Sequence, residues 1–264
     1  ATPIPRTLAV TVFGDLDVST LTELPAGRQG ITTHVVQLSQ PTLVARTWTR
    51  IAEEVASGRQ AFVVCPRIDE DDPGEELIAS GGLAEEELIF SDGTDEMAAE
   101  LAKKPRQPLA SAIGMTDSLR GIPALANLRI ETLHGRMSAE EKADVMSRFT
   151  AREIDVLVST TVIEVGVDVP NATVMVILDA DRFGVSQLHQ LRGRVGRGGL
   201  PGLCLLLTSA EEQSVALERV RAVAATLDGF KLSEIDLELR REGDVLGSTQ
   251  SGGRSSLKLL RVVQ

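Results

Sequence analysis

Cysteines are scarce in this sequence, and long apolar runs are absent. The 264 residues include two cysteines, Cys65 and Cys204, both inside short apolar stretches. This argues against a disulfide-stabilised scaffold and favours a reduced compartment. No apolar run approaches the ~18 residues that a membrane-spanning helix requires. The first residues also lack the basic region and apolar core of a signal peptide. We therefore expect a cytoplasmic protein with no membrane partner.

A nucleotide-binding P-loop is also missing. The sequence contains no Gly-Lys dipeptide, which that loop requires to cradle phosphates. The acidic run Asp69–Asp72 follows an apolar stretch and resembles the acid pair that holds Mg²⁺ in nucleotide hydrolases. We reject that interpretation, because no P-loop precedes the run to present a nucleotide and its metal. The sequence thus predicts no metal ligands.

A net basic charge, which nucleic-acid binders usually carry, is lacking as well. The 27 Lys and Arg face 38 Asp and Glu, for a net charge of −11, and phosphate contacts need an excess of basic residues. However, 13 of the acids lie between Asp69 and Glu100, a stretch without Lys or Arg. We interpret residues 69–111 as a mobile acidic insertion, since the segment has few large apolar residues to offset its ordering entropy. A partly helical arm around Leu83–Phe90 is the alternative.

Alternating strand and helix patterns predict an α/β fold. Short apolar runs typical of strands lie at Leu8–Phe13, Thr32–Leu38, Ala61–Cys65, Arg129–Leu133, Asp155–Ser159, Thr173–Leu178 and Leu203–Thr208. Helical patterns lie at Leu43–Ala56, Ile113–Asn127, Ala139–Ala151, Ser186–Arg194, Ala210–Leu227 and Ser233–Arg240, with Gly229 as the expected break between the last two. This order predicts a parallel sheet with helices on both faces. Ligands of such sheets sit at the carboxyl ends of the strands, so we expect the chemistry in the loops that follow them.

The strongest candidate for binding chemistry is the segment Gln187–Gly198. Three arginines fall within six residues there, at Arg192, Arg194 and Arg197, with glycines between them. Each guanidinium offers a rigid fork of donors suited to phosphate, and the glycines let the backbone approach a ligand closely. A solvated basic loop is the alternative for three arginines taken alone.

A second candidate is the segment Val156–Pro170. An apolar strand leads there into Thr160 and Thr161, then into a turn and Gly166-Val167-Asp168. Hydroxyls and backbone amides at a helix start suit nucleic-acid phosphates, and a carboxylate after a glycine suits a ribose hydroxyl or an arginine. Ordinary strand-to-helix turn chemistry is the alternative for this segment by itself.

Together these two segments resemble motifs V and VI of superfamily 2 helicases. Upstream, Leu133–Met137 resembles the motif of the same lobe that touches the DNA backbone, and Ala1–Thr7 resembles motif III, which links the two lobes. The stretch Gly14–Asp17, followed by Glu23–Arg28, narrows the resemblance to the bacterial RecG family. It covers nearly the whole chain apart from the acidic insertion.

The resemblance implies a domain organisation. Residues 1–30 would hold motif III and the inter-lobe linker, residues 31–208 the RecA-like second helicase lobe, and residues 209–264 the helical hairpin and loop called the TRG motif. Two departures affect that loop. The run Arg240–Asp244 differs from the family's usual Arg-Gly-Pro-Gly-Glu, and Thr249 stands where the family usually has an arginine. They leave the loop conformation and one phosphate contact open, whereas Arg240 and Gln250 match.

The resemblance also implies residue roles. ATP and Mg²⁺ would be held mainly by a preceding lobe that carries the P-loop. Residues of this chain would complete the ATP site, contact DNA or couple the lobes. The ATP-site residues are Arg194 and Arg197 as arginine fingers, Gln190 in orientation, and Gly166 and Asp168 near the nucleotide. His134, Thr160 and Thr161 would contact DNA, and Thr2, Arg6, Arg240 and Gln250 would couple the lobes. A packed or capping role is the alternative for His134, and His34 and His189 are interpreted as structural.

The function implied is that of an ATP-dependent translocase or helicase on branched double-stranded DNA, active in fork regression, Holliday junction branch migration, recombination and repair. The implied partners are branched DNA, the protein's own N-terminal lobe and wedge domain, and single-stranded-DNA-binding protein. The protein would be monomeric and nucleoid-associated in a bacterial cytoplasm, and this part alone would not be an active ATPase. Two alternatives remain: a non-catalytic duplex-binding module, and the equivalent part of the transcription-repair coupling factor.

Overall fold

A parallel sheet of six strands forms the centre of the molecule. The structure is a computed structural model that describes residues 30–69, 109–161 and 169–238. The strand order is β1-β6-β5-β2-β4-β3, and every neighbouring pair is parallel. The strands are β1 (Ile31–Gln37), β2 (Gln60–Val64), β3 (Ile130–Leu133), β4 (Val156–Ser159), β5 (Ala172–Ile177) and β6 (Gly202–Thr208). The predicted α/β class is confirmed, and the predicted strand Leu8–Phe13 lies outside the described residues.

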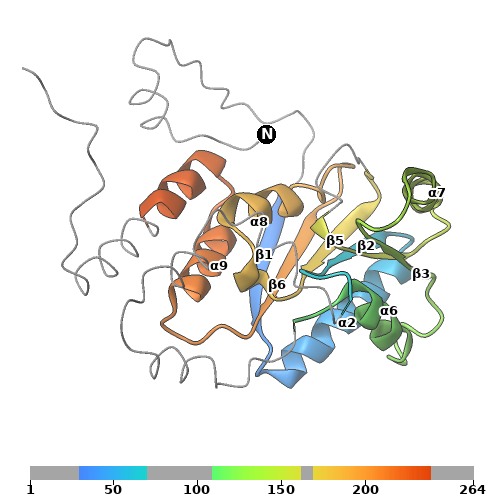
Figure 1. Cartoon of the computed structure of the whole chain (residues 1–264), viewed down its shortest axis with the longest axis horizontal. Helices are drawn as coiled ribbons and strands as arrows, with labels where there is room; N and C mark the ends of the chain where they lie inside the picture. The colour runs from blue at the N-terminus through green and yellow to red at the C-terminus, as the bar shows by residue number, and fades with distance from the viewer. Residues whose placement is uncertain (1–29, 70–108, 162–168, 239–264) are drawn as a thin grey trace, which may run out of the picture.

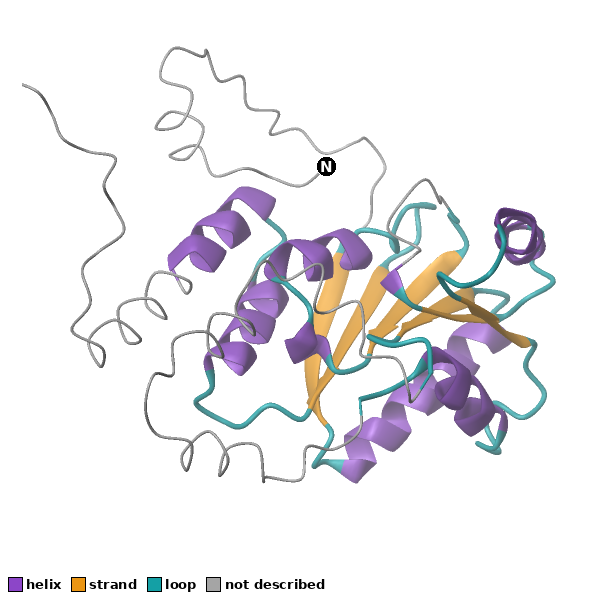
Figure 2. Ribbon diagram, viewed as in Figure 1, coloured by secondary structure: helices purple, strands orange, loops and turns teal. Residues whose placement is uncertain are grey.

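Helices cover both faces of this sheet (Figures 1 and 2). They are α2 (Pro41–Ala56), α6 (Ala112–Arg120), α7 (Ala139–Thr150), α8 (Val185–Arg192) and α9 (Val215–Ala225), with a 3₁₀ turn η2 at Ala180–Arg182. Side chains of a strand alternate between faces, so Met175 and Ile177 pack in the core under α7, α8 and α9. Val174 and Val176 pack in the core under α2 and α6. The sheet is therefore buried on both sides, as its continuous apolar strands predict.

Three predicted helix boundaries were wrong. Helix α6 ends at Arg120 rather than at residue 127, because Gly121 and Pro123 follow and proline cannot continue a helix. Helix α9 starts at Val215 rather than at residue 210, where Ser214 accepts a hydrogen bond from the Leu217 backbone N–H. The next helix begins at residue 229, so Gly229 lies inside it and is not the break.

Asp228 explains that last difference. Its carboxylate accepts hydrogen bonds from the backbone N–H groups of Phe230 and Lys231, at 2.9 and 3.3 Å, which is how an aspartate caps a helix start. Residues 229–238 are helical, and residue 239 onward lies outside the described part. Val220, Val223 and Leu232 belong to the core under α7, α8 and α9. The described part of the C-terminal appendage thus packs directly on the sheet domain.

The two ends of the predicted acidic insertion lie together. Arg67 forms an isolated parallel bridge with Ser111, and the Ala112 backbone N–H donates to the Arg67 carbonyl at 2.9 Å. The Ala110 N–H donates to the Asp179 carboxylate at 2.7 Å. Residues 70–108, which include most of the predicted insertion, lie outside the described residues. In the part that is described, no helix has both the length and the apolar character to cross a membrane.

Candidate functional site

Helix α8 positions the arginine- and glycine-rich loop of residues 193–201. The helix starts after Gly184, whose backbone N–H donates to the Gln187 side chain at 3.1 Å, and it ends before Gly193. Arg194 is half-buried and Arg197 is exposed. The Arg197 Nε donates to the Gly193 carbonyl at 2.8 Å, which folds the loop back on the helix end.

This loop packs against the residues that precede β5. A Cβ placed on Gly198 would overlap the Pro170 carbonyl oxygen, so only glycine fits there. A Cβ on Gly202 would lie 3.0 Å from the Gly196 backbone nitrogen. The ends of the two candidate segments, Val156–Pro170 and Gln187–Gly198, therefore meet in space. The meeting point is the amino edge of the sheet, where β5 and β6 begin.

The other candidate residues lie at the opposite, carboxyl edge. Leu133 pairs with Ser159 at the last register position of β3 and β4, and the Thr160 N–H donates to the Leu133 carbonyl at 3.3 Å. His134 follows directly and is half-buried, as is Thr161, while Thr160 is only 1% exposed. In this arrangement the Thr160 side chain lies within the turn and not on the surface.

Three buried polar atoms gather at this carboxyl edge. Among the described residues, His134 Nδ1, Ser159 Oγ and Thr160 Oγ1 have no hydrogen-bond partner. Buried polar atoms in folded proteins nearly always have a hydrogen-bond partner, and a buried atom without one costs about 1–3 kcal/mol. A cluster of three at adjacent strand ends suits a ligand that brings its own polar atoms.

The arginine- and glycine-rich loop lies at the amino edge, not at the carboxyl edge where we expected the chemistry. Parallel strands β5 and β6 need a crossover, and α8 carries the chain back along the sheet. The loop after α8 therefore emerges where β6 starts. The candidate ATP-site arginines and the candidate DNA contacts occupy opposite edges of one sheet.

The start of α7 shapes the surroundings of His134. Ser138 and Glu141 form the predicted capping box, with backbone-to-side-chain distances of 2.7 and 3.2 Å. These hydrogen bonds hold the pKa of Glu141 below its usual value. Lys142 Nζ donates to the Gly135 carbonyl at 2.7 Å, and Arg136 pairs with Asp69. The carboxyl edge thus presents two basic side chains beside His134.

Arg192 is the site residue that the sequence interpretation misplaced. Its guanidinium was taken, with those of Arg194 and Arg197, as suited to phosphate, yet Arg192 is 1% exposed and enclosed in the core. The signal was present, because Arg192 follows Leu188 by four residues and so shares its helix face, and Leu188 is buried. His189, interpreted as structural, makes a 2.9 Å contact through Nδ1 with Arg192 Nη2.

Several predicted site residues cannot be placed. Gly166, Asp168, Thr2, Arg6, Arg240 and Gln250 lie outside the described residues. Gln190 is described and lies half-buried on α8, three residues before the loop. In the described ranges, no group of three or more His, Cys, Asp or Glu is placed to hold a metal ion.

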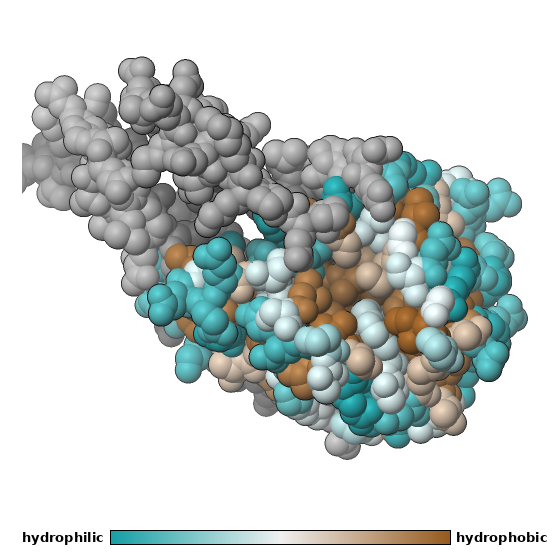
Figure 3. Space-filling model, turned by 90° about the horizontal axis from the view of Figure 1, so that it is seen from below, coloured by the Kyte–Doolittle hydropathy of each residue, from teal (hydrophilic) through white to brown (hydrophobic). Residues whose placement is uncertain are grey.

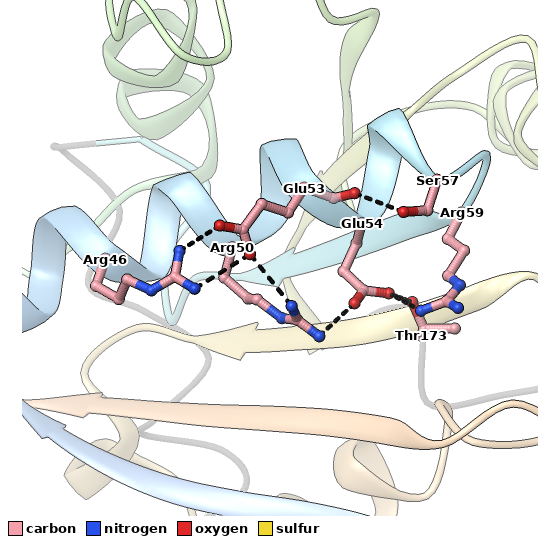
Figure 4. Close-up of polar contacts among 7 residues, drawn as sticks. All are labelled: Arg46, Arg50, Glu53, Glu54, Ser57, Arg59 and Thr173. Atoms are coloured by element: carbon pink, nitrogen blue, oxygen red, sulfur yellow. Dashed lines mark hydrogen bonds and ion pairs between the residues drawn. The ribbon is translucent and has the colours of Figure 1, made fainter.

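A cavity of about 580 Å³ lies on the α2 face, between α2, β1 and β6. Seen from below, apolar side chains gather around a hollow in the described surface (Figure 3). Its lining includes His34, which was interpreted as structural and is exposed. One wall carries a polar network centred on Glu54 (Figure 4). Of the predicted ATP and DNA residues that the structure describes, none lines this cavity.

Comparisons with known proteins place these observations in a family. Residues 85–199 match the family described as helicase conserved C-terminal domain. The chain is 51% identical over 265 residues to the ATP-dependent DNA helicase RecG of Mycobacterium tuberculosis, which covers the whole chain and 32% of that protein. It is 43% identical over 252 residues to RecG of Bacillus subtilis, covering 96% of the chain and 31% of the relative. The chain thus spans about a third of the length of these relatives.

A solved structure adds the fold. The structure of RecG bound to a three-way DNA junction superimposes with a TM-score of 0.63 at 36% identity, over 92% of this chain and 27% of that one. The sheet described above is therefore the RecA-like lobe that the sequence predicted. By sequence identity over its whole length and by its fold, the chain belongs to the RecG helicase family and corresponds to a C-terminal part of it.

Proposed function

We propose that this chain is the second lobe and coupling appendage of an ATP-dependent DNA helicase that translocates on double-stranded DNA. The observation that carries the proposal is the division of candidate groups between the two edges of the sheet. Arginines suited to phosphate lie at the amino edge, and unsatisfied buried polar atoms lie at the carboxyl edge. A protein that couples ATP hydrolysis to DNA movement needs two such sites on one rigid body.

At the amino edge, Arg194 and Arg197 would act as arginine fingers toward the γ-phosphate of ATP, with Gln190 orienting the site. The reason is electrostatic, since negative charge spreads over the phosphoryl oxygens in the transition state and a guanidinium stabilises it there. Arg197 is exposed at the loop surface, as a group that reaches across to another lobe must be. Gly166 and Asp168 would lie near the same nucleotide.

The phosphates and Mg²⁺ would be held by a preceding lobe. The described residues offer no acidic cluster for a metal, and the chain has no Gly-Lys dipeptide. This chain would therefore supply only arginine side chains to the phosphates of ATP. By itself this chain would then neither bind ATP tightly nor hydrolyse it. Mg²⁺, when bound, neutralises charge on the phosphate oxygens.

At the carboxyl edge, His134, Thr160 and Thr161 would contact the DNA backbone. Hydroxyl and imidazole N–H groups donate to phosphate oxygens and position a duplex without reading its sequence. The buried Thr160 Oγ1 and His134 Nδ1 have no partner in the described part of the chain. Binding would bring Thr160 to the phosphate through a small movement of the β4 turn.

The complete protein would act on branched DNA, by regression of stalled forks and branch migration of Holliday junctions in recombination and repair. Support comes from the RecG structure bound to a three-way junction. Thr2, Arg6, Arg240 and Gln250 would couple lobe closure to translocation. A wedge domain, the first lobe and single-stranded-DNA-binding protein would be its partners, in a monomer associated with the bacterial nucleoid.

The test is ATP hydrolysis by the complete protein. Arg194→Ala and Arg197→Ala should each lower the DNA-stimulated turnover by roughly 10³- to 10⁵-fold, as loss of an arginine finger does, with duplex affinity largely kept. Arg120→Ala, on the exposed surface of α6, is the matched control and should leave turnover unchanged. Wild-type turnover in both loop variants would remove the finger assignment.

A further inference from the structure

Arg192 is the largest side chain that is fully buried among the described residues. It is the last residue of α8, directly before the arginine- and glycine-rich loop. Burying a cation is costly unless its donors are satisfied. The burial of Arg192 therefore needs a structural explanation, separate from the phosphate contacts proposed for Arg194 and Arg197.

The hydrogen bonds of Arg192 run to the end of α9. Its Nη1 donates to the carbonyl oxygens of Val223 and, at 2.8 Å, Thr226. Val223 lies in the last turn of α9 and Thr226 is the residue after the helix. The last carbonyls of a helix lack intrahelical partners and carry partial negative charge. A guanidinium fork satisfies two of them at once.

His189 completes the arrangement one helical turn earlier on α8. The Nη2 of Arg192 lies 2.9 Å from His189 Nδ1. A guanidinium only donates, so Nδ1 must accept, and neutral His189 carries its proton on Nε2. The guanidinium plane is thus fixed from both sides, by α8 itself and by the end of α9.

The hydrogen bonds of Arg192 join the arginine- and glycine-rich loop to the appended helices, which lie apart in the sequence. Gly193 and Arg194 follow Arg192 directly, and Arg197 is bonded back to the Gly193 carbonyl. Thr226 is followed after two residues by the second appended helix, residues 229–238. Val220, Val223 and Leu232 pack in the same core as Leu188 and Leu191 of α8. A displacement of either appended helix would therefore move Arg192 and the start of the loop at Gly193.

We propose that Arg192 is a positioning residue that couples the loop at 193–198 to the appended helices at 215–238. Movement of the appendage re-aims Arg194 and Arg197, and closure of the loop on a nucleotide pulls on the end of α9. The catalytic consequence rests on the proposed function, whereas the mechanical coupling stands on the geometry alone.

The coupling is tested in this chain by hydrogen–deuterium exchange read by mass spectrometry. Arg192→Met keeps the length of the side chain and removes its donors; Arg192→Lys keeps the charge and loses the fork. We expect both variants to exchange faster in residues 193–198 and 223–232, with Lys intermediate. Phe149→Leu, in α7 with its ring against Phe62, is the control for general destabilisation. Faster exchange confined to 223–232, or the same pattern in Phe149→Leu, would overturn the coupling.

The catalytic consequence is tested in the complete protein. Arg192→Met should lower the kcat of DNA-stimulated ATP hydrolysis by roughly 10- to 100-fold, the cost of a small misplacement of catalytic groups, with KM for ATP little changed. Arg192→Lys is the second variant, for use if Arg192→Met folds poorly, and its loss of kcat should be smaller. Arg192 variants with normal kcat, beside inactive Arg194→Ala, would refute positioning. Normal kcat in Arg194→Ala would instead refute the proposed function and leave the exchange result standing.

Discussion

Adjacent glutamates on α2 provide a sharp test of the energetics. Glu54 is buried, accepts hydrogen bonds from Arg59 at 2.8 Å and Thr173 at 2.7 Å, and forms an ion pair with Arg50 at 2.6 Å. Glu53 is 43% exposed and pairs with Arg46 and Arg50. Figure 4 shows both carboxylates on the same helix, with only Glu54 reaching β5. The two positions share their chemistry and differ in burial.

We expect Glu54→Gln to lower the free energy of unfolding by about 2–3 kcal/mol. Breaking a fully buried ion pair costs about 3–5 kcal/mol, and the arginine partners here are partly exposed, at 41% and 30%. Glu53→Gln should change stability little, because exposed pairs are screened by water. Urea unfolding of the purified chain at pH 7, followed by far-UV circular dichroism, measures both.

The pH dependence adds an independent check. Burial alone would raise the pKa of Glu54, but the hydrogen bonds from Arg59 and Thr173 and the charges of Arg50 and Arg59 hold it below its usual 4.5. A lowered folded-state pKa gives stability that is present above about pH 4.5 and lost as the pH falls through the folded-state pKa. The gap between wild type and Glu54→Gln should shrink in that window. Equal losses for Glu53→Gln and Glu54→Gln at pH 7 would refute the reasoning.

Three further predictions concern other parts of the fold. Ser138→Ala should cost about 1 kcal/mol of stability through loss of the α7 cap, measured by urea unfolding. Gly198→Ala should displace the arginine- and glycine-rich loop, since its Cβ would meet the Pro170 carbonyl, and should lower ATP turnover of the complete protein. Gly58→Ala, strained only by its positive φ, is the control and should leave turnover intact. Burial alone would raise the pKa of Asp155, but hydrogen bonds from Arg129 outweigh it and lower that pKa. Asp155→Asn should therefore destabilise the chain at pH 7 but not below the lowered pKa, and a loss that persists at low pH would contradict this.

Local signals in the sequence determined the secondary structure. Each described strand lies within one residue of its predicted range, because a buried parallel strand is a short apolar run with polar ends. The capping box at Ser138 fixed the start of α7. Helix ends were missed where a competing signal was overlooked: Pro123 after α6, Ser214 before α9 and Asp228 before the last described helix.

The family and the identity of the candidate residues also followed from the sequence alone, since motifs are patterns of neighbouring residues. Their placement in space did not follow. Arg192, Arg194 and Arg197 look equivalent along the chain, yet one is buried and another exposed. The difference depends on which face of α8 meets the core and on where α9 docks, and both are decided by contacts between distant segments.

The same holds for the two edges of the sheet. The sequence determined that the chain is a parallel α/β lobe with an arginine- and glycine-rich run and a hydroxyl-bearing turn. Only the tertiary structure decided that these lie on opposite edges, because α8 must return along the sheet before β6 can pair parallel to β5. It also decided that buried Arg192 joins the run to the end of α9, since the carbonyls of Val223 and Thr226 lie within reach of its guanidinium.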